Sequence, residues 1–263
     1  MTQTQPSATA PVIEFIGVEK SFGDNTVYAD MDLSVKRGET LTIIGGSGQG
    51  KSVCLKMMIG LLQADAGVVK VEGKTVGEQN AEGLRAIRQR VAYVFQGGAL
   101  FDSMTVLENI GYALREHTEL DDAGILDKAR SCVDMVGLQE RVLQSMPSSL
   151  SGGMRKRVAL ARSIAIEPEV ILYDEPTTGL DPKNINRISA MIMKLQRELK
   201  VTSVVVTHDM PTARKVSDRI AMLYEKRFPF VGTAEEMWHS PQGEVRDFIH
   251  GTLREAEARH HGP

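Results

Sequence analysis

Cysteine is scarce in this sequence, and no run of apolar residues is long. The 263 residues include two cysteines, Cys54 and Cys132, which lie far apart and form no Cys-x-x-Cys pair. This usage argues against a disulfide framework or a zinc site and favours a reducing compartment. No apolar stretch approaches the roughly 18 residues that a membrane-spanning helix needs. We therefore expect a soluble chain whose membrane role, if it has one, depends on a partner that spans the bilayer.

An excess of positive charge is also missing. The sequence holds 31 Lys and Arg against 34 Asp and Glu, and its pI is about 6.1. Proteins that bind nucleic acids usually carry a basic stripe, so the balance argues against that class, although it does not exclude a local basic patch. Residues 1–11 have neither an apolar run nor a basic start. We read them as a disordered lead-in and not as a signal peptide.

Apolar residues make up 42% of the chain, enough for the core of one large domain. Short apolar runs rich in β-branched residues are typical of strands buried on both faces of a parallel sheet. We predict such strands at 41–44, 91–95, 170–173, 203–206 and 220–223. Helical patterns such as 185–199 and 210–217 lie between them, and this alternation favours an α/β fold.

Three other regions have different patterns. Residues 12–35 and 66–76 alternate in polarity and carry turn signals, which predicts an antiparallel sheet at one edge. Residues 104–164 contain no convincing strand and predict a helical insertion. Near the end of the chain, one helical face collects apolar residues at Val245, Phe248, Ile249 and Leu253. That face either packs on its own domain or contacts a neighbouring subunit.

A glycine-rich segment, Gly45-Gly46-Ser47-Gly48-Gln49-Gly50-Lys51-Ser52, fits the pattern G-x-x-x-x-G-K-[ST]. It follows the predicted strand 41–44 and precedes a helical run at 53–62, so backbone N–H groups and a helix N-terminus point at an anion. Lys51 would reach the β- and γ-phosphates of a nucleotide, and the Ser52 hydroxyl would take a Mg²⁺ position. The alternative is a glycine-rich turn that merely ends a strand.

Two acids, Asp174 and Glu175, directly follow the predicted strand 170–173. Carboxylates at the carboxyl end of a buried parallel strand lie beside the crevice where ligands bind. Asp174 suits a metal ion, and Glu175 suits a base that orients or deprotonates an attacking water. The alternative is a strand that simply runs into an acidic turn.

Other polar residues follow strands or begin a helix. His208 comes after the strand 203–206 and is placed to hydrogen-bond a γ-phosphate, with a structural histidine as the alternative. Gln96 follows the strand 91–95, and its amide suits a metal and a water, though an isolated Gln is a weak signal. The run Leu150-Ser151-Gly152-Gly153-Met154 precedes a predicted helix. Ser151 suits its N-cap and the glycines admit an anion, so the run predicts a second phosphate-binding terminus or an ordinary capped helix.

In this order, the motifs resemble those of the nucleotide-binding subunits of ABC transporters over about residues 12–235. The shared motifs are the phosphate loop, Gln96, LSGGM at 150–154, Asp174-Glu175, Gly179-Leu180-Asp181 and His208. The resemblance implies a RecA-like P-loop NTPase domain of the α/β class with an antiparallel β-subdomain at its edge. It places a helical insertion at about 97–164 and a C-terminal extension at 236–263.

The resemblance also implies an ATPase that uses ATP and Mg²⁺ and works as a homodimer, because two such subunits sandwich two ATP molecules. The implied nucleotide contacts are Gly45 to Val53, Ser151, Gly152 and Gly153. The implied metal ligands are Ser52, Gln96 and Asp174, and the implied catalytic residues are Glu175, His208 and Gln96. Ser151 and Gly153 would serve the ATP of the second copy, and Asp181 would lie at the subunit junction. Phe22 falls where the family places an aromatic that stacks on adenine; core packing is the alternative.

Smaller features resemble a narrower group, the ATPases of the Mla or Mce-linked phospholipid transporters. They are Val53, Met154 within the run 154–162, and the ending at 245–251. This resemblance implies a phospholipid cargo, a place on the cytoplasmic face of the inner membrane, and three partners: a permease, a STAS-domain subunit and an Mce-domain subunit.

Leu100, Phe101 and Met104 follow Gln96 and are apolar in a loop-like setting. They either receive a helix of the permease, as the family uses this region, or are buried inside the helical insertion. Two other functions stay open: an ABC ATPase for another cargo, and a non-transport ABC ATPase. The single cassette and the lack of a basic tract argue against the second. A P-loop kinase is a further rival, and the LSGGM run argues against it.

Overall fold

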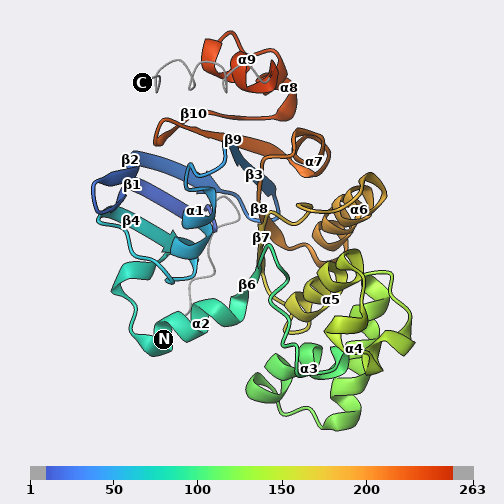
Figure 1. The fold of residues 1–263 in the computed structure, drawn as a ribbon. Coiled ribbons are helices and arrows are strands. Elements are labelled where there is room, and N and C mark those ends of the chain that lie inside the picture. Colours follow the sequence, from blue (N-terminus) through green and yellow to red (C-terminus); the bar gives the residue numbers. More distant parts are fainter. Residues whose placement is uncertain (1–9, 251–263) are drawn as a thin grey trace. The chain divides into compact units, whose positions relative to one another are not determined.

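The computed structural model describes residues 10–250. They group into two compact units: of the described residues, unit 1 comprises 10–80 with 204–250, and unit 2 comprises Ala81–Ser203. Figure 1 shows their helices and strands. Residues 1–9 of the lead-in predicted at 1–11, together with Leu253, lie outside the described residues. Within the described part, no helix combines the length and the apolar character that crossing a membrane requires.

Unit 1 contains a four-stranded sheet in the order β2-β1-β4-β5, in which every neighbouring pair is antiparallel. Its strands are β1 (Ile13–Phe22), β2 (Asn25–Val35), β4 (Ala66–Val71) and β5 (Lys74–Thr75), followed by a 3₁₀ turn at Val76–Glu78. The antiparallel sheet expected from residues 12–35 and 66–76 is therefore confirmed. Register shifts in the β1–β2 pair fall between Phe15 and Ser21 and bend the ribbon.

The second layer of unit 1 is built on β3 (Thr40–Gly45) and β9 (Arg219–Tyr224), which pair in parallel. All six residues of β3 are buried, as its continuous apolar run predicts for a strand covered on both faces. β10 (Arg227–Gly232) pairs with β9 in the antiparallel direction. The helices α1 (Lys51–Met58) and α7 (Met210–Val216) follow β3 and β8 (Thr202–Thr207).

The chain continues from β10 into α8 (Ala234–Trp238) and α9 (Gly243–His250). Val245 is fully buried in a cluster with residues of β3 and β9, and Phe248 and Ile249 pack against the same cluster. These three members of the predicted apolar face therefore pack on their own unit. Packing on the same unit is therefore present, and a contact of the partly buried Phe248 and Ile249 with a neighbouring subunit stays a prediction.

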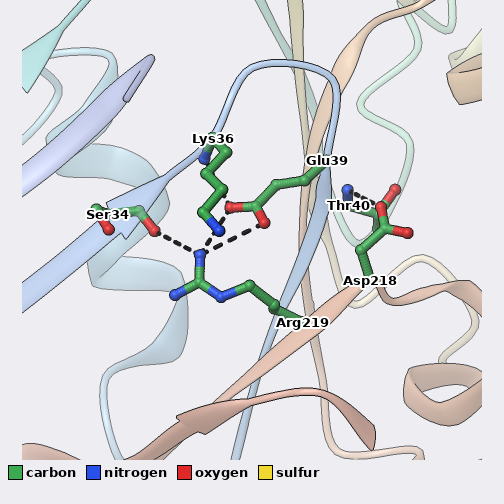
Figure 2. Close-up of polar contacts among 6 residues, drawn as sticks. All are labelled: Ser34, Lys36, Glu39, Thr40, Asp218 and Arg219. Carbon is green, nitrogen blue, oxygen red and sulfur yellow. Dashed lines mark hydrogen bonds and ion pairs between the residues drawn. The ribbon is translucent and has the colours of Figure 1, made fainter. Parts of the chain in front are cut away.

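A partly buried ion pair lies near the starts of β3 and β9 in unit 1 (Figure 2). The Arg219 guanidinium donates to the Glu39 carboxylate at 3.0 Å and to the main-chain oxygen of Ser34 at 3.3 Å. Asp218 accepts a hydrogen bond from the backbone N–H of Thr40 at 2.8 Å. The network thereby connects β2, the turn before β3 and β9, and it satisfies the buried Glu39 carboxylate, which would otherwise be costly to bury.

Unit 2 carries β6 (Val91–Val94) and β7 (Val170–Asp174), which pair in parallel. Between them the chain forms α3 (Val106–His117), α4 (Asp122–Met135), two 3₁₀ turns and α5 (Gly152–Ile164). The unit also contains α2 (Ala81–Arg90) and α6 (Pro182–Leu199). The first two residues of β8, Thr202 and Ser203, are the last residues of this unit. All five strands predicted from apolar runs are present, and the α/β class is confirmed.

Candidate functional site

The phosphate loop of unit 1 connects β3 to α1. Gly48 and Gly50 adopt left-handed φ angles of 80° and 96°, which glycine tolerates at no steric cost. A Cβ on Gly50 would lie 2.2 Å from Cγ1 of Val27, so no larger residue fits there without movement. Gly50 caps α1 without a side-chain hydrogen bond, and the first turn of the helix holds no acid. The N–H groups at this terminus are therefore arranged to donate hydrogen bonds to an anion.

Lys51 folds back over the loop. Its Nζ donates to the main-chain oxygens of Gly45 at 3.0 Å and Gly46 at 2.9 Å, and the residue is only 7% exposed. An ammonium placed this deeply needs polar partners or an anion. Ser52, the next residue of α1, is half-buried. The glycines, the helix terminus and the buried cation of this loop are thus suited to bind the phosphates of a nucleotide.

Tyr28 is a contact of this loop that the sequence did not reveal. Its buried hydroxyl donates to the main-chain oxygen of Gly50 at 2.5 Å and lies 3.0 Å from Sγ of Cys54. The same Gly50 oxygen accepts the N–H of Val53 at 2.7 Å. Burial raises the pKa of the Cys54 thiol to about 12 and also raises the pKa of Tyr28. The pair therefore stays neutral and anchors the start of α1 to β2.

Phe22 and His208 also belong to unit 1. Phe22 is 47% exposed, with the Lys20 ammonium 5.2 Å from its ring centroid. The alternative interpretation, that Phe22 packs in the core, is therefore wrong. Its stacking on adenine stays a prediction. His208 is exposed just after β8, directly before the N-cap of α7 at Asp209. A buried structural histidine is thus excluded, while the phosphate contact stays a prediction.

Unit 2 holds the two acids at the end of β7. Asp174 is 8% exposed, and its Oδ2 accepts a hydrogen bond of 2.8 Å from the hydroxyl of Tyr93 on the neighbouring β6. Burial, followed by the nearby Asp174 carboxylate, raises the pKa of Tyr93, so the hydroxyl remains a donor. A carboxylate with one oxygen fixed in this way keeps acceptor capacity for a metal or a water.

Glu175 adopts a left-handed φ of 48°, an uncommon angle for a residue with a side chain. Its Oε2 accepts a 3.0 Å hydrogen bond from the hydroxyl of Thr178. Glu175 is 9% exposed, so the carboxylate lies in a restricted setting. Backbone strain of this kind often occurs at functional sites, and here it falls on the residue predicted to be the base.

Gln96 is exposed after β6, and the loop that follows it is fixed to the helices of unit 2. Arg162 of α5 donates to the main-chain oxygens of Ala99 at 2.8 Å and Gly98 at 3.0 Å. Asn109 of α3 donates to the oxygen of Phe101 at 3.1 Å and accepts the N–H of the same residue. The loop that follows Gln96 is therefore held at residues 98–101.

The apolar residues of that loop are not buried together. Phe101 is 44% exposed and its ring centroid lies 5.1 Å from that of Tyr112, which is exposed as well. Leu100 and Met104 are half-buried. Burial inside the helical part is wrong for Phe101, and a role as docking surface stays a prediction.

The LSGGM run begins α5 as expected. Ser151 is the N-cap, and its Oγ accepts the N–H of Met154 at 3.3 Å. Ser151 and Gly152 are exposed, whereas a Cβ on Gly153 would lie 2.9 Å from Oδ1 of Asn184. An ordinary capping role for Ser151 is thus present, and its exposed terminus also leaves room for an anion.

Asp181 has a local structural role in this chain. It is the N-cap of α6 and accepts the N–H of Asn184 at 3.0 Å, and this bond lowers the pKa of the Asp181 carboxyl. Asp181 is exposed. A contact with a second subunit stays a prediction.

Unit 1 supplies the glycine loop after β3 and the buried Lys51. Unit 2 supplies the acids at the end of β7 and the helix α5 that Ser151 caps. These features are those of a phosphate-loop ATPase. The profile of the ABC transporter family matches residues 28–178. The chain belongs to that family and is an ATP-hydrolysing cassette.

Three comparisons describe its relatives. The chain is 38% identical over 239 residues to the Mycobacterium leprae (strain TN) protein named probable ribonucleotide transport ATP-binding protein mkl, covering 91% of this chain and 69% of that one. It is 35% identical over 244 residues to the Escherichia coli (strain K12) intermembrane phospholipid transport system ATP-binding protein MlaF, covering 93% and 90%. The dimeric, post-hydrolysis structure of the ATP-binding cassette MJ0796 with ADP and Pi matches with a TM-score of 0.77 at 32% identity, covering 84% and 98%.

Proposed function

We propose that this ATPase energises an ABC transporter that moves phospholipids between bacterial membranes. The observation that carries the proposal is the match to MlaF, which extends over nearly the whole length of both chains. Val53 and Met154, the departures from commoner family motifs, support it. The name of mkl favours a ribonucleotide instead, so a transporter for another cargo is the second candidate. A non-transport ABC ATPase has no comparable support.

In the proposed reaction, a water attacks the γ-phosphorus of ATP as Glu175 accepts its proton, and ADP leaves with the bridging oxygen. Lys51 and the N-terminus of α1 bind the phosphates. His208 hydrogen-bonds the γ-phosphate, and Phe22 stacks on adenine. Mg²⁺, when bound, neutralises phosphate charge.

The proposed metal ligands fit that ion by their chemistry. Ser52 supplies a hydroxyl oxygen, Asp174 a carboxylate oxygen and Gln96 an amide oxygen. Mg²⁺ prefers such oxygen ligands together with phosphate oxygens and water. The hydrogen bond from Tyr93 orients the Asp174 carboxylate for this role.

The proposed working form is a homodimer in which each ATP lies between two copies. The dimeric state of the MJ0796 cassette supports this arrangement. Ser151, Gly152 and Gly153 at the exposed start of α5 then contact the ATP that is held by the phosphate loop of the second copy. ATP binding closes the pair, and hydrolysis removes the γ-phosphate contacts that hold it closed.

The proposed location is the cytoplasmic face of the inner membrane, where the cassette binds a multispanning permease. Phe101 and Tyr112 form an exposed aromatic pair in unit 2, which suits a helix of that permease because aromatic residues are enriched in protein interfaces. A STAS-domain subunit and an Mce-domain subunit complete the proposed assembly.

Two measurements test the function. Glu175→Gln should leave ATP binding intact and abolish turnover, because the amide cannot accept the proton; near-normal hydrolysis would sink the assignment of the base. Purification of the native complex with its membrane subunits, followed by mass spectrometry of bound lipids, tests the cargo. Recovery of a permease with phospholipid supports the proposal, whereas a complex that carries a different solute favours the second candidate.

A further inference from the structure

The side chain of Lys156 on α5 binds the loop that follows β7. Its Nζ donates to the main-chain oxygen of Thr178 at 2.8 Å, to that of Pro176 at 3.0 Å and, over 3.4 Å, to that of Glu175. An ammonium has three donors. All three are directed at one short loop, so Lys156 connects α5 to the predicted base and to the residues that directly follow it.

These bonds act on a strained segment. Glu175 has its left-handed φ of 48°, and such a conformation persists only when the surroundings enforce it. The side chain of Glu175 accepts its hydrogen bond from the hydroxyl of Thr178, the residue whose main-chain oxygen Lys156 also binds. Lys156 therefore binds the main chain of both residues, Glu175 and Thr178, whose side chains form the hydrogen bond that orients the carboxylate.

The charge of Lys156 is not needed for packing. Burial lowers the pKa of its ammonium, and the neighbouring Glu175 carboxylate opposes that effect. A methionine would fill similar space without this cost. The ammonium is therefore partly desolvated, and its hydrogen bonds to the loop offset that cost.

We propose that Lys156 is a positioning residue for ATP hydrolysis: it holds the Glu175–Thr178 loop so that the Glu175 carboxylate is oriented toward the attacking water. The inference rests on the proposed role of Glu175 as the base. It adds that α5, whose first residues carry the Ser151 motif, also sets the geometry of the base on the same chain. In this role Lys156 acts through Glu175 and not through the nucleotide.

The experiment compares Lys156→Met, Lys156→Arg and the control Lys128→Met in the full chain. Lys128 is also a helical lysine of unit 2, but its partner is Glu167, an exposed residue outside the proposed site. Lys156→Met should lower kcat by about 10- to 100-fold, the scale on which a small misplacement of a reacting group acts. KM for ATP and the affinity for ADP should stay within about twofold, because the variant leaves the phosphate loop and the start of α5, the proposed nucleotide contacts, unchanged.

Rescue and control separate positioning from a general loss of structure. Lys156→Arg should recover most of kcat because it keeps a charged donor, and Lys128→Met should match the wild type. If Lys156→Met does not fold, Lys156→Gln carries the test, since it removes the charge and should lower kcat by at least about threefold with KM unchanged. A wild-type kcat in the folded variant, or a parallel rise in KM, would overturn the inference.

A double variant distinguishes this inference from the function on which it rests. If Lys156 acts through Glu175, adding Lys156→Met to Glu175→Gln should leave the residual single-turnover rate unchanged. A further tenfold fall in that rate would overturn the positioning role while leaving the base assigned. Near-normal hydrolysis by Glu175→Gln alone would instead refute the base, whatever the Lys156 variants do.

Discussion

Gly50→Ala should destabilise the chain more than Gly48→Ala, although both replace a loop glycine with left-handed φ. The φ angles are 96° at Gly50 and 80° at Gly48, so each alanine pays a similar backbone cost of about 1–2 kcal/mol. The surroundings differ. A Cβ at Gly50 would lie 2.2 Å from Cγ1 of Val27, whereas a Cβ at Gly48 meets no atom within 4 Å.

The difference between the two variants measures the clash. Overpacking of this kind costs about 1–3 kcal/mol, because Val27 is β-branched and rotates little. At roughly 3 °C per kcal/mol, the thermal midpoint of Gly50→Ala should fall about 3–9 °C below that of Gly48→Ala. Val27→Ala removes the opposing methyl groups, so it should reverse most of this gap in the Gly50→Ala background.

The assay is thermal unfolding followed by circular dichroism, with the nucleotide-free chain so that lost ATP binding does not contribute. Gly50→Ala and Gly48→Ala, each with and without Val27→Ala, are compared at one concentration and ionic strength. Equal midpoints for Gly50→Ala and Gly48→Ala would refute the reasoning, and so would a Val27→Ala change that lowers the midpoint equally in both backgrounds.

Three further outcomes follow from buried groups. Burial raises the pKa of Cys54 to about 12 and that of Cys132 to about 11, so iodoacetamide at pH 8 should label neither in the native chain and both after unfolding; rapid native labelling would contradict this. Tyr93→Phe removes a donor from the buried carboxylate at the end of β7 and should cost about 1.5–3 kcal/mol of unfolding free energy, whereas Tyr112→Phe at an exposed site should change little. Arg219→Met should cost about 1.5–3 kcal/mol because the buried Glu39 carboxylate loses its cationic partner and keeps the hydrogen bond from the N–H of Lys36, and an apolar replacement of both partners should recover most of it; equal losses would argue against a stabilising pair.

The strands were predictable because burial on both faces produces continuous apolar runs. The runs at 41–44 and 170–173 mark β3 and β7, and the motifs at their ends follow from the carboxyl ends of buried strands. The N-cap at Ser151 was predictable for a local reason too, since its bond to Met154 spans three residues. Local patterns were therefore enough to place the elements and the motif residues.

The tertiary contacts of the motifs were not predictable. Tyr28 is 22 residues from Gly50, and Tyr93 is 81 residues from Asp174. Periodicity shows that such tyrosines lie in strands, but it does not say which polar atom their hydroxyls meet. Phe22 was open to core packing for the same reason, because an aromatic residue near the end of a strand has the same local pattern whether buried or exposed.

Two inactive variants, when mixed, test the central claim that each ATP is hydrolysed between two copies. Lys51→Ala disables the phosphate loop, and Ser151→Arg blocks the start of α5, so each variant alone should have no activity. In a mixed dimer, the loop of the Ser151→Arg copy meets the intact α5 of the Lys51→Ala copy, and one complete site forms. Equal amounts should recover up to about a quarter of wild-type hydrolysis, because half of the dimers are mixed and each holds one of two sites. Activity no greater than that of the separate variants would contradict the composite site.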